Sequence, residues 1–183
     1  MRIWVLVLGG MMVAMSAAAQ DTASPDAHVR LYQSDQALVI KSQGDAGASA
    51  KTDPLSTVNE VALKLSFVCA ETGCAGASAH MTVESIGGDT AAITLTPAAN
   101  GLRADVDGQP VALVLKQGEA FDLRIHWNAG HRVTFDLYHN DPTTGASSME
   151  SHDAKLTSNV RDLAMSTSHG ALTLLSQTYT FGR

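Results

Sequence analysis

Polar side chains with the chemistry of a binding or catalytic site are densest between residues 121 and 139. Apolar residues alternate there with charged or aromatic ones, so the polar set falls on one face of two neighbouring strands. The candidate site residues are Asp122, Arg124, His126, Arg132, Asp136 and Tyr138. Together they provide the donors and acceptors of a saccharide- or peptide-binding groove. The alternative is a solvated face whose cross-strand charge pairs contribute a few tenths of a kcal/mol each.

Motifs for nucleophilic catalysis and metal binding are missing from the sequence. It contains no Gly-x-Ser-x-Gly segment, no phosphate-binding loop and no His-Glu-x-x-His motif. The seven histidines include no pair with His-x-His or His-x3-His spacing. The sequence therefore predicts no metal site and no cofactor.

The two cysteines predict a structural disulfide. Four residues separate Cys69 from Cys74, and one of them is Gly73, which helps the chain to bend. An isolated pair with this spacing matches neither a zinc motif nor the Cys-x-x-Cys redox motif. In an exported protein, an even number of cysteines indicates a Cys69–Cys74 bridge.

The first 19 residues have the pattern of a secretory signal peptide. Arg2 precedes the apolar run 3–15, and Ala17-Ala18-Ala19 forms a small-residue cleavage site. The run is too short to span a bilayer and no second one follows, so we expect no membrane insertion of the mature chain. The predicted organisation is a signal peptide (1–19), a flexible N-terminus (20–27) and one domain (28–183). The predicted location is the periplasm or the extracellular space.

A hydrophobic period of two dominates the mature chain. Candidate strands recur about every 10–12 residues and are separated by Gly-rich turns. This spacing predicts an all-β fold, a single antiparallel β-sandwich of the jelly-roll or immunoglobulin-like type. Residues 43–57 and 140–159 are predicted to be loops, and residues 159–165 are the one helix candidate. The predicted core consists of Val61, Leu63, Leu65, Phe67, Met81, Val83, Ile93, Leu95, Leu113, Phe121, Leu123, Ile125, Trp127, Val133, Phe135 and Leu137.

Turn chemistry predicts how the strands pair. A three-residue loop at 128–130, with Gly130 in the left-handed conformation, pairs Ile125 with Val133 and places Asp122 opposite Asp136. The same reasoning on residues 87–89 pairs Val83 with Ile93. Asp107-Gly108 predicts a two-residue hairpin turn.

The charge balance restricts the possible partners. The chain has 18 Asp and Glu residues against 12 Lys and Arg residues, a formal net charge of −6. No cluster of Lys and Arg residues interrupts this acidic balance, which argues against nucleic acid and anionic membrane surfaces as partners.

The segment 118–138 resembles the central hairpin of concanavalin-like jelly rolls. In laminin-G-type and alginate-lyase-type domains, a Phe-x-Leu-x-Ile-x-Trp … Gly … Val-x-Phe rhythm recurs on adjacent strands, as it does here from Phe121 to Phe135. The lyases also have Arg-x-Glu, Gln-x-His and Tyr-Phe-Lys-x-Gly-x-Tyr strands. Ile125-His126 matches half of the second pattern, and the other two are absent from this sequence.

Three functions remain open on the sequence alone. The first is a non-catalytic binding module of the cell envelope or secretome, for a glycan or another envelope protein. The second is a small polysaccharide-acting enzyme in which His126 and Tyr138 serve as base and acid. The third is a fimbrial-type subunit, with 29–41 as a donated strand and Cys69–Cys74 as its bridge. The missing catalytic motifs favour the first, and the oligomeric state is not predicted.

Overall fold

The computed structural model describes residues 37–42, 47–52, 55, 57–71, 73–141 and 144–181. The predicted signal peptide and flexible N-terminus lie outside these residues. The described part of the chain forms strands and turns. It contains no helix that is long and apolar enough to cross a membrane.

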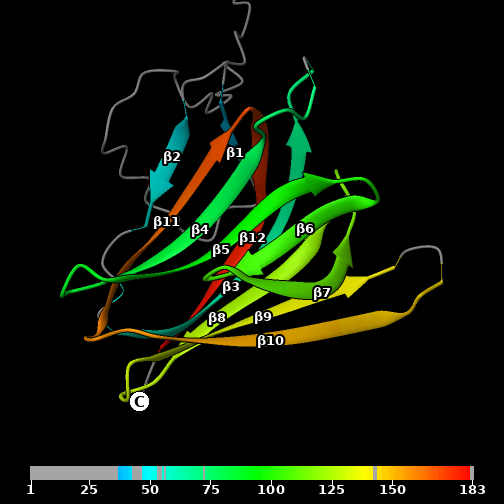
Figure 1. Ribbon diagram of the computed structural model, residues 1–183. Coiled ribbons are helices and arrows are strands. Elements are labelled where there is room, and N and C mark those ends of the chain that lie inside the picture. Colours follow the sequence, from blue (N-terminus) through cyan, green and yellow to red (C-terminus); the bar gives the residue numbers. More distant parts are fainter. Residues whose placement is uncertain are drawn as a thin grey trace, which may run out of the picture.

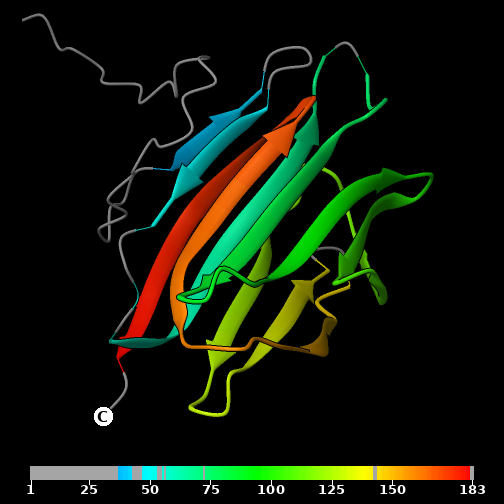
Figure 2. The same ribbon diagram turned by 60° about the vertical axis from the view of Figure 1, so that its left-hand side comes forward.

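Within the described residues, twelve strands form two six-stranded antiparallel sheets that pack face to face (Figure 1). In spatial order, the first sheet consists of β1 (Leu38–Lys41), β12 (Gly170–Phe181), β3 (Val58–Cys69), β8 (Phe121–Trp127), β9 (Arg132–Asn140) and β10 (Ser147–Lys155). The second sheet consists of β2 (Ala48–Lys51), β11 (Val160–Ser168), β4 (Ser78–Ser85), β5 (Thr90–Ala98), β6 (Gly101–Val106) and β7 (Gln109–Leu115). Figure 2 shows the short strands β1 and β2 side by side along one edge. The predicted antiparallel β-sandwich is confirmed, with more strands than the seven to nine of an immunoglobulin domain.

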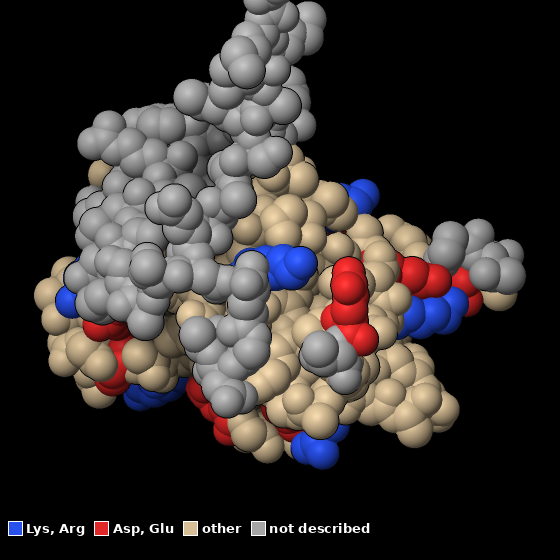
Figure 3. Space-filling model, turned by 90° about the horizontal axis from the view of Figure 1, so that it is seen from above, with Lys and Arg blue, Asp and Glu red and all other residues tan. Residues whose placement is uncertain are grey.

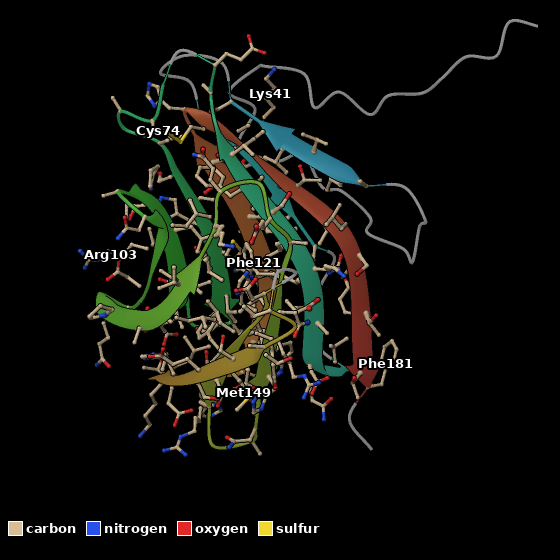
Figure 4. All side chains as sticks on the ribbon, turned by 90° about the vertical axis from the view of Figure 1, so that its right-hand side faces the viewer. Lys41, Cys74, Arg103, Phe121, Met149 and Phe181 are labelled. Carbon is tan, nitrogen blue, oxygen red and sulfur yellow. A yellow bond between two sulfur atoms is a disulfide. The ribbon has the colours of Figure 1, made fainter. Side chains whose placement is uncertain are left out.

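The core lies between the sheets and follows the predicted alternation. In β3, Val61, Leu63, Leu65 and Phe67 are buried, because every second side chain of a strand points to the same face. Of the sixteen predicted core residues, fourteen are buried and two are only half-buried at the margin of the core, Leu113 and Trp127. Figure 4 shows Phe121 between the two sheets.

The predicted disulfide is present. Cys69, the last residue of β3, is bonded to Cys74 in the turn that leads to β4. The closed loop is short, so the chain-entropy model gives a stabilisation of about 2 kcal/mol. A disulfide is consistent with an oxidising environment.

The β8–β9 hairpin has the predicted loop length but a different register. Asn128 Oδ1 accepts hydrogen bonds from the N–H groups of Gly130 and Arg132, so the three-residue loop is 129–131. His131, not Gly130, takes the left-handed conformation, with φ of 61°. Every cross-strand partner therefore shifts by two residues, and Ile125 pairs with Phe135. A shift of two keeps each side chain on its predicted face but gives it a different neighbour.

The turn between β4 and β5 differs from its prediction in the same way. Val83 pairs with Ala91 instead of Ile93, because Ser85 pairs with Asp89 and the loop is 86–88. The predicted turn at Asp107-Gly108 is correct, and both of its residues have positive φ.

Three strands lie where the sequence predicted loops or a helix. β10 occupies much of the predicted loop 140–159, and β2 lies within the predicted loop 43–57. The helix candidate 159–165 belongs to β11, where a bulge after Val160 interrupts the alternation. The fimbrial alternative needed 29–41 as a donated strand. Its described part, β1, pairs with β12 of the same chain, and residues 29–36 lie outside the described residues.

Glu150 joins the two sheets at their open edge, where β10 and β7 are the outermost strands. Its carboxylate accepts a hydrogen bond from the backbone N–H of Leu113 on β7 at 2.9 Å. The pKa of Glu150 is lowered, chiefly by the backbone N–H of Ala112, then by His152 and the N–H of Leu113. Because the pKa of Glu150 is lowered in the folded protein, this contact stabilises the fold fully at a pH above about 4.5, the pKa of the group in the unfolded chain. The stabilisation is lost as the pH falls below that value.

Glu150→Gln is therefore expected to lower the free energy of unfolding by about 1 kcal/mol at neutral pH, through loss of a charge-assisted hydrogen bond. The variant should also lose less stability than the parent when the pH falls from about 5 to 3. Urea unfolding across this range measures both effects. Glu71→Gln is the control, because this exposed carboxylate has no ion pair or hydrogen bond to another described residue. Identical acid profiles for parent and Glu150→Gln would contradict the assignment.

Candidate functional site

The outer face of the first sheet carries the candidate residues in rows that cross the strands. The register aligns one side chain from each of β12, β3, β8, β9 and β10 in every row. The first row is Ser176, Lys64, Asp122, Tyr138 and Met149, the second is Thr178, Ala62, Arg124, Asp136 and Ser151, and the third is Thr180, Glu60, His126, Thr134 and Asp153. Five of the six predicted site residues lie in these rows, and Arg132 follows in the next one, opposite Lys155.

An open hollow of about 280 Å³ lies over the first two rows. We call it the Tyr138 hollow. The small side chain of Ala62 leaves space between the longer side chains of the neighbouring strands. The polar residues that line the hollow are Lys64, Asp122, Arg124, Tyr138, Ser176 and Thr178.

The polar groups of this hollow are mostly unpaired within the described part of the chain. Lys64 and Asp122 are cross-strand neighbours, yet neither takes part in an ion pair or hydrogen bond with another described residue. The hydroxyl groups of Tyr138, Ser176 and Thr178 also form no hydrogen bond with another described residue. The hollow thus presents a carboxylate, an ammonium and three hydroxyls to a ligand.

Arg124 is the one charged residue of the hollow that is held in place. Its guanidinium carbon lies 5.7 Å from the centre of the Tyr138 ring, and its Nε lies 3.7 Å from Glu60 Oε1. A cation–π contact and an ion pair on a half-exposed side chain are each worth about 1 kcal/mol or less. Their effect is to fix the directions of Arg124 and Tyr138 beside the hollow.

Asp136 differs from its prediction. We expected it to be at least partly exposed and opposite Asp122, but it is only 8% exposed and lies opposite Arg124. Its carboxylate accepts a hydrogen bond of 2.6 Å from Ser151 Oγ and lies 3.2 Å from His126 Nε2. The predicted like-charge pair is therefore absent, and Asp136 instead orients the His126 ring.

His126 and Tyr138, the predicted base and acid of the enzyme alternative, are not brought together. Tyr138 lies four residues from Thr134, the cross-strand partner of His126, which is about 13 Å along β9. Tyr138 lines the hollow and His126 does not. General acid–base catalysis needs both groups within hydrogen-bond reach of one reacting centre, and these two are not.

Among the described residues, no group of three or more His, Cys, Asp or Glu side chains could hold a metal ion. On the surface that Figure 3 displays outside its grey atoms, basic and acidic side chains are scattered in small groups, several of them mixed, without a continuous basic stripe. Nucleic-acid binding uses such a stripe.

Sequence reasoning missed four residues of the hollow, namely Ala62, Lys64, Ser176 and Thr178. The alternation in 61–67 does place Ala62 and Lys64 on an outer face. Their position beside Asp122 and Arg124 depends on the strand order β12-β3-β8, which joins segments far apart in the chain. No local sequence signal encodes that order.

Comparison with known proteins adds information on the fold. No family model and no curated protein sequence matches the chain. The apo Crh5 transglycosylase structure is similar with a TM-score of 0.53 at 10% sequence identity, covering 80% of this chain and 72% of that chain. Lectin II from Ulex europaeus has a TM-score of 0.47 at 12% identity, covering 66% of this chain and 71% of the lectin. SCP-B, a peptidase of the eqolisin family, has a TM-score of 0.46 at 11% identity, covering 73% of both chains. At 10% identity the likeness to the Crh5 structure shows the sandwich fold alone, because one fold hosts many functions.

Proposed function

We propose that the chain is an exported, non-catalytic glycan-binding module, and that the Tyr138 hollow is its binding site. The observation that carries the proposal is a set of polar groups around a small open hollow that have no partner among the described residues, with an aromatic ring held at the margin of the hollow. Polar groups on a folded surface with no partner in the protein are available to a ligand at no cost in broken internal contacts.

A sugar ring matches this chemistry well. Its hydroxyls both donate and accept, so they can pair with the Asp122 carboxylate, the Lys64 ammonium and the hydroxyls of Ser176 and Thr178. Its C–H face packs against an aromatic ring, which Tyr138 offers together with a phenolic hydroxyl. The hollow is small and open, which suits one unit of a glycan chain better than a large apolar ligand.

Non-catalytic binding is supported over hydrolysis by the separation of His126 from Tyr138. Export is supported by the leader-like pattern of 1–19 and by the disulfide. The periplasm and the extracellular space both fit an oxidised Cys69–Cys74 pair.

A panel of immobilised polysaccharides tests the proposal. It should include neutral polymers such as dextran and xylan, uronate polymers such as polygalacturonate, and sulfated dextran. We expect the purified protein to bind at least one polymer reversibly and to release no new reducing ends from it. Binding to none of the polymers, or turnover of the one bound, would contradict the proposal.

A further inference from the structure

A second hollow lies on the same outer face, beyond the third row. It has a volume of about 440 Å³ and lies where the β8–β9 loop meets the end of β10. We call it the Arg132 hollow. Its lining consists of Asn128, Gly130, Arg132, Asp153, Ala154 and Lys155.

The charge of this hollow is positive. Arg132 and Lys155 are direct cross-strand neighbours on β9 and β10. Asp153 lies 3.5 Å from Arg132 Nε and also accepts a hydrogen bond of 2.7 Å from Thr134. Lys155 has no ion pair or hydrogen bond to any described residue. One carboxylate thus faces two cations, and an anionic group of a ligand would neutralise the positive charge that remains.

The two hollows are arranged along one strand. Tyr138 and Arg132 are six residues apart on β9, so the hollows lie about 20 Å from each other. Between them the outer face carries the polar side chains of His126 and Thr134. A monosaccharide cannot bridge this distance, whereas an oligosaccharide of several units can.

The distribution of charge over the molecule distinguishes this face. It carries five of the nine Lys and Arg residues that the structure describes, namely Lys41, Lys64, Arg124, Arg132 and Lys155. It carries only four of the thirteen described Asp and Glu residues, namely Glu60, Asp122, Asp136 and Asp153. The rest of the described surface is strongly acidic and would repel an anionic polymer, so such a polymer is directed to this face.

We infer that the Arg132 hollow is an anion-binding subsite and that the ligand is a linear acidic polysaccharide. One sugar unit occupies the Tyr138 hollow, and the carboxylate or sulfate group of a unit further along the chain lies between Arg132 and Lys155. This inference rests on the proposed glycan-binding function and adds the charge and the minimum length of the ligand. The path between the subsites follows β8 and β9.

Oligosaccharides of increasing length test it. We would measure affinities by calorimetry for fragments of one to six units from each uronate or sulfated polymer that binds in the panel. Matched fragments would have their carboxylates reduced to alcohols or their sulfates removed. Affinity should rise at least about tenfold once the fragment spans both hollows, and this gain should disappear for the uncharged fragments. The uronate and sulfate series separate the two sources of negative charge.

The double variant Arg132→Gln/Lys155→Gln should lose that tenfold gain and much of the salt dependence of binding, while its affinity for the shortest fragment stays unchanged. Lys116→Gln, an exposed lysine outside both hollows, is the control. Equal affinity for short and long fragments, no effect of the double variant, or binding of neutral polymers alone would overturn the inference. In these cases the Tyr138 hollow would still bind glycan. Binding to no glycan at all would overturn the proposed function instead.

Discussion

Tyr138→Ala is expected to weaken glycan binding at least about 30-fold while the fold remains intact. An aromatic anchor at a binding surface is worth about 2 kcal/mol or more, which corresponds to this change in affinity. The side chain is half-buried on the outer face and its hydroxyl has no hydrogen-bond partner in the described residues. Its loss should therefore change the free energy of unfolding by less than about 1 kcal/mol.

Two further variants make this result specific. Tyr138→Phe keeps the ring and removes the hydroxyl, so its affinity should fall between those of the parent and Tyr138→Ala. Arg103→Ala removes an exposed, ion-paired arginine from β6 on the opposite sheet, where it points into solvent (Figure 4). Its affinity should equal that of the parent. An unchanged affinity in Tyr138→Ala would remove the hollow from the binding site.

Phe135→Ala should have the largest effect on stability, a loss of about 3–5 kcal/mol. Phe135 is fully buried in β9, on the face opposite to Asp136 and Tyr138, and the cavity left by its ring cannot be refilled by neighbours. Trp127→Ala should cost less, about 1–2 kcal/mol, because Trp127 is only half-buried at the end of β8.

Chemical denaturation of both variants measures this contrast. The size of the loss in Phe135→Ala also tests which face of the β8–β9 hairpin is the core, since the proposed binding residues alternate with the buried ones. Equal losses for the two variants would mean that Trp127 lies as deep as Phe135. A loss below about 1 kcal/mol for Phe135→Ala would reverse the assignment of the faces.

The sequence was enough to predict which side chains of a strand point inward, but not which side chains lie beside them on the neighbouring strands. Alternation places Leu123 inside and Arg124 outside whatever strand lies beside them, because it depends only on the geometry of one strand. The partner of Arg124 depends on where the β8–β9 loop begins. The side chain of Asn128 determines that position by bonding two backbone N–H groups. A displacement of the loop by one residue was enough to replace Thr134 by Asp136 as that partner.

The missed strands have a related physical explanation. The inward side chains of β10 include Glu150 and His152, which bond to each other instead of packing as apolar residues, and Glu150 also bonds to β7. A strand with polar residues on its inner face has no hydrophobic alternation to detect. In β11 the bulge after Val160 lets both Val160 and Leu163 face the core, although they are three residues apart in the sequence, and that spacing of apolar residues is typical of a helix.

The candidate site was predicted in part for the same reasons. The six predicted residues do lie on the outer face of the first sheet, but only Asp122, Arg124 and Tyr138 line the Tyr138 hollow. Arg132 lines the second hollow, and Asp136 is buried beside His126. The half of the Tyr138 hollow that comes from β3 and β12 depends on the sheet order.

Backbone amide chemical shifts, recorded while an isotope-labelled sample is titrated with the glycan selected by the panel, test the central claim most directly. We expect shift changes that follow the outer face of β12, β3, β8 and β9, with the largest at Ala62, Asp122 and Tyr138. The amides of β4, β5 and β6 should remain unchanged. Shift changes centred on the opposite sheet, around His80 and Thr94, would contradict the account and move the binding site to the other face of the sandwich.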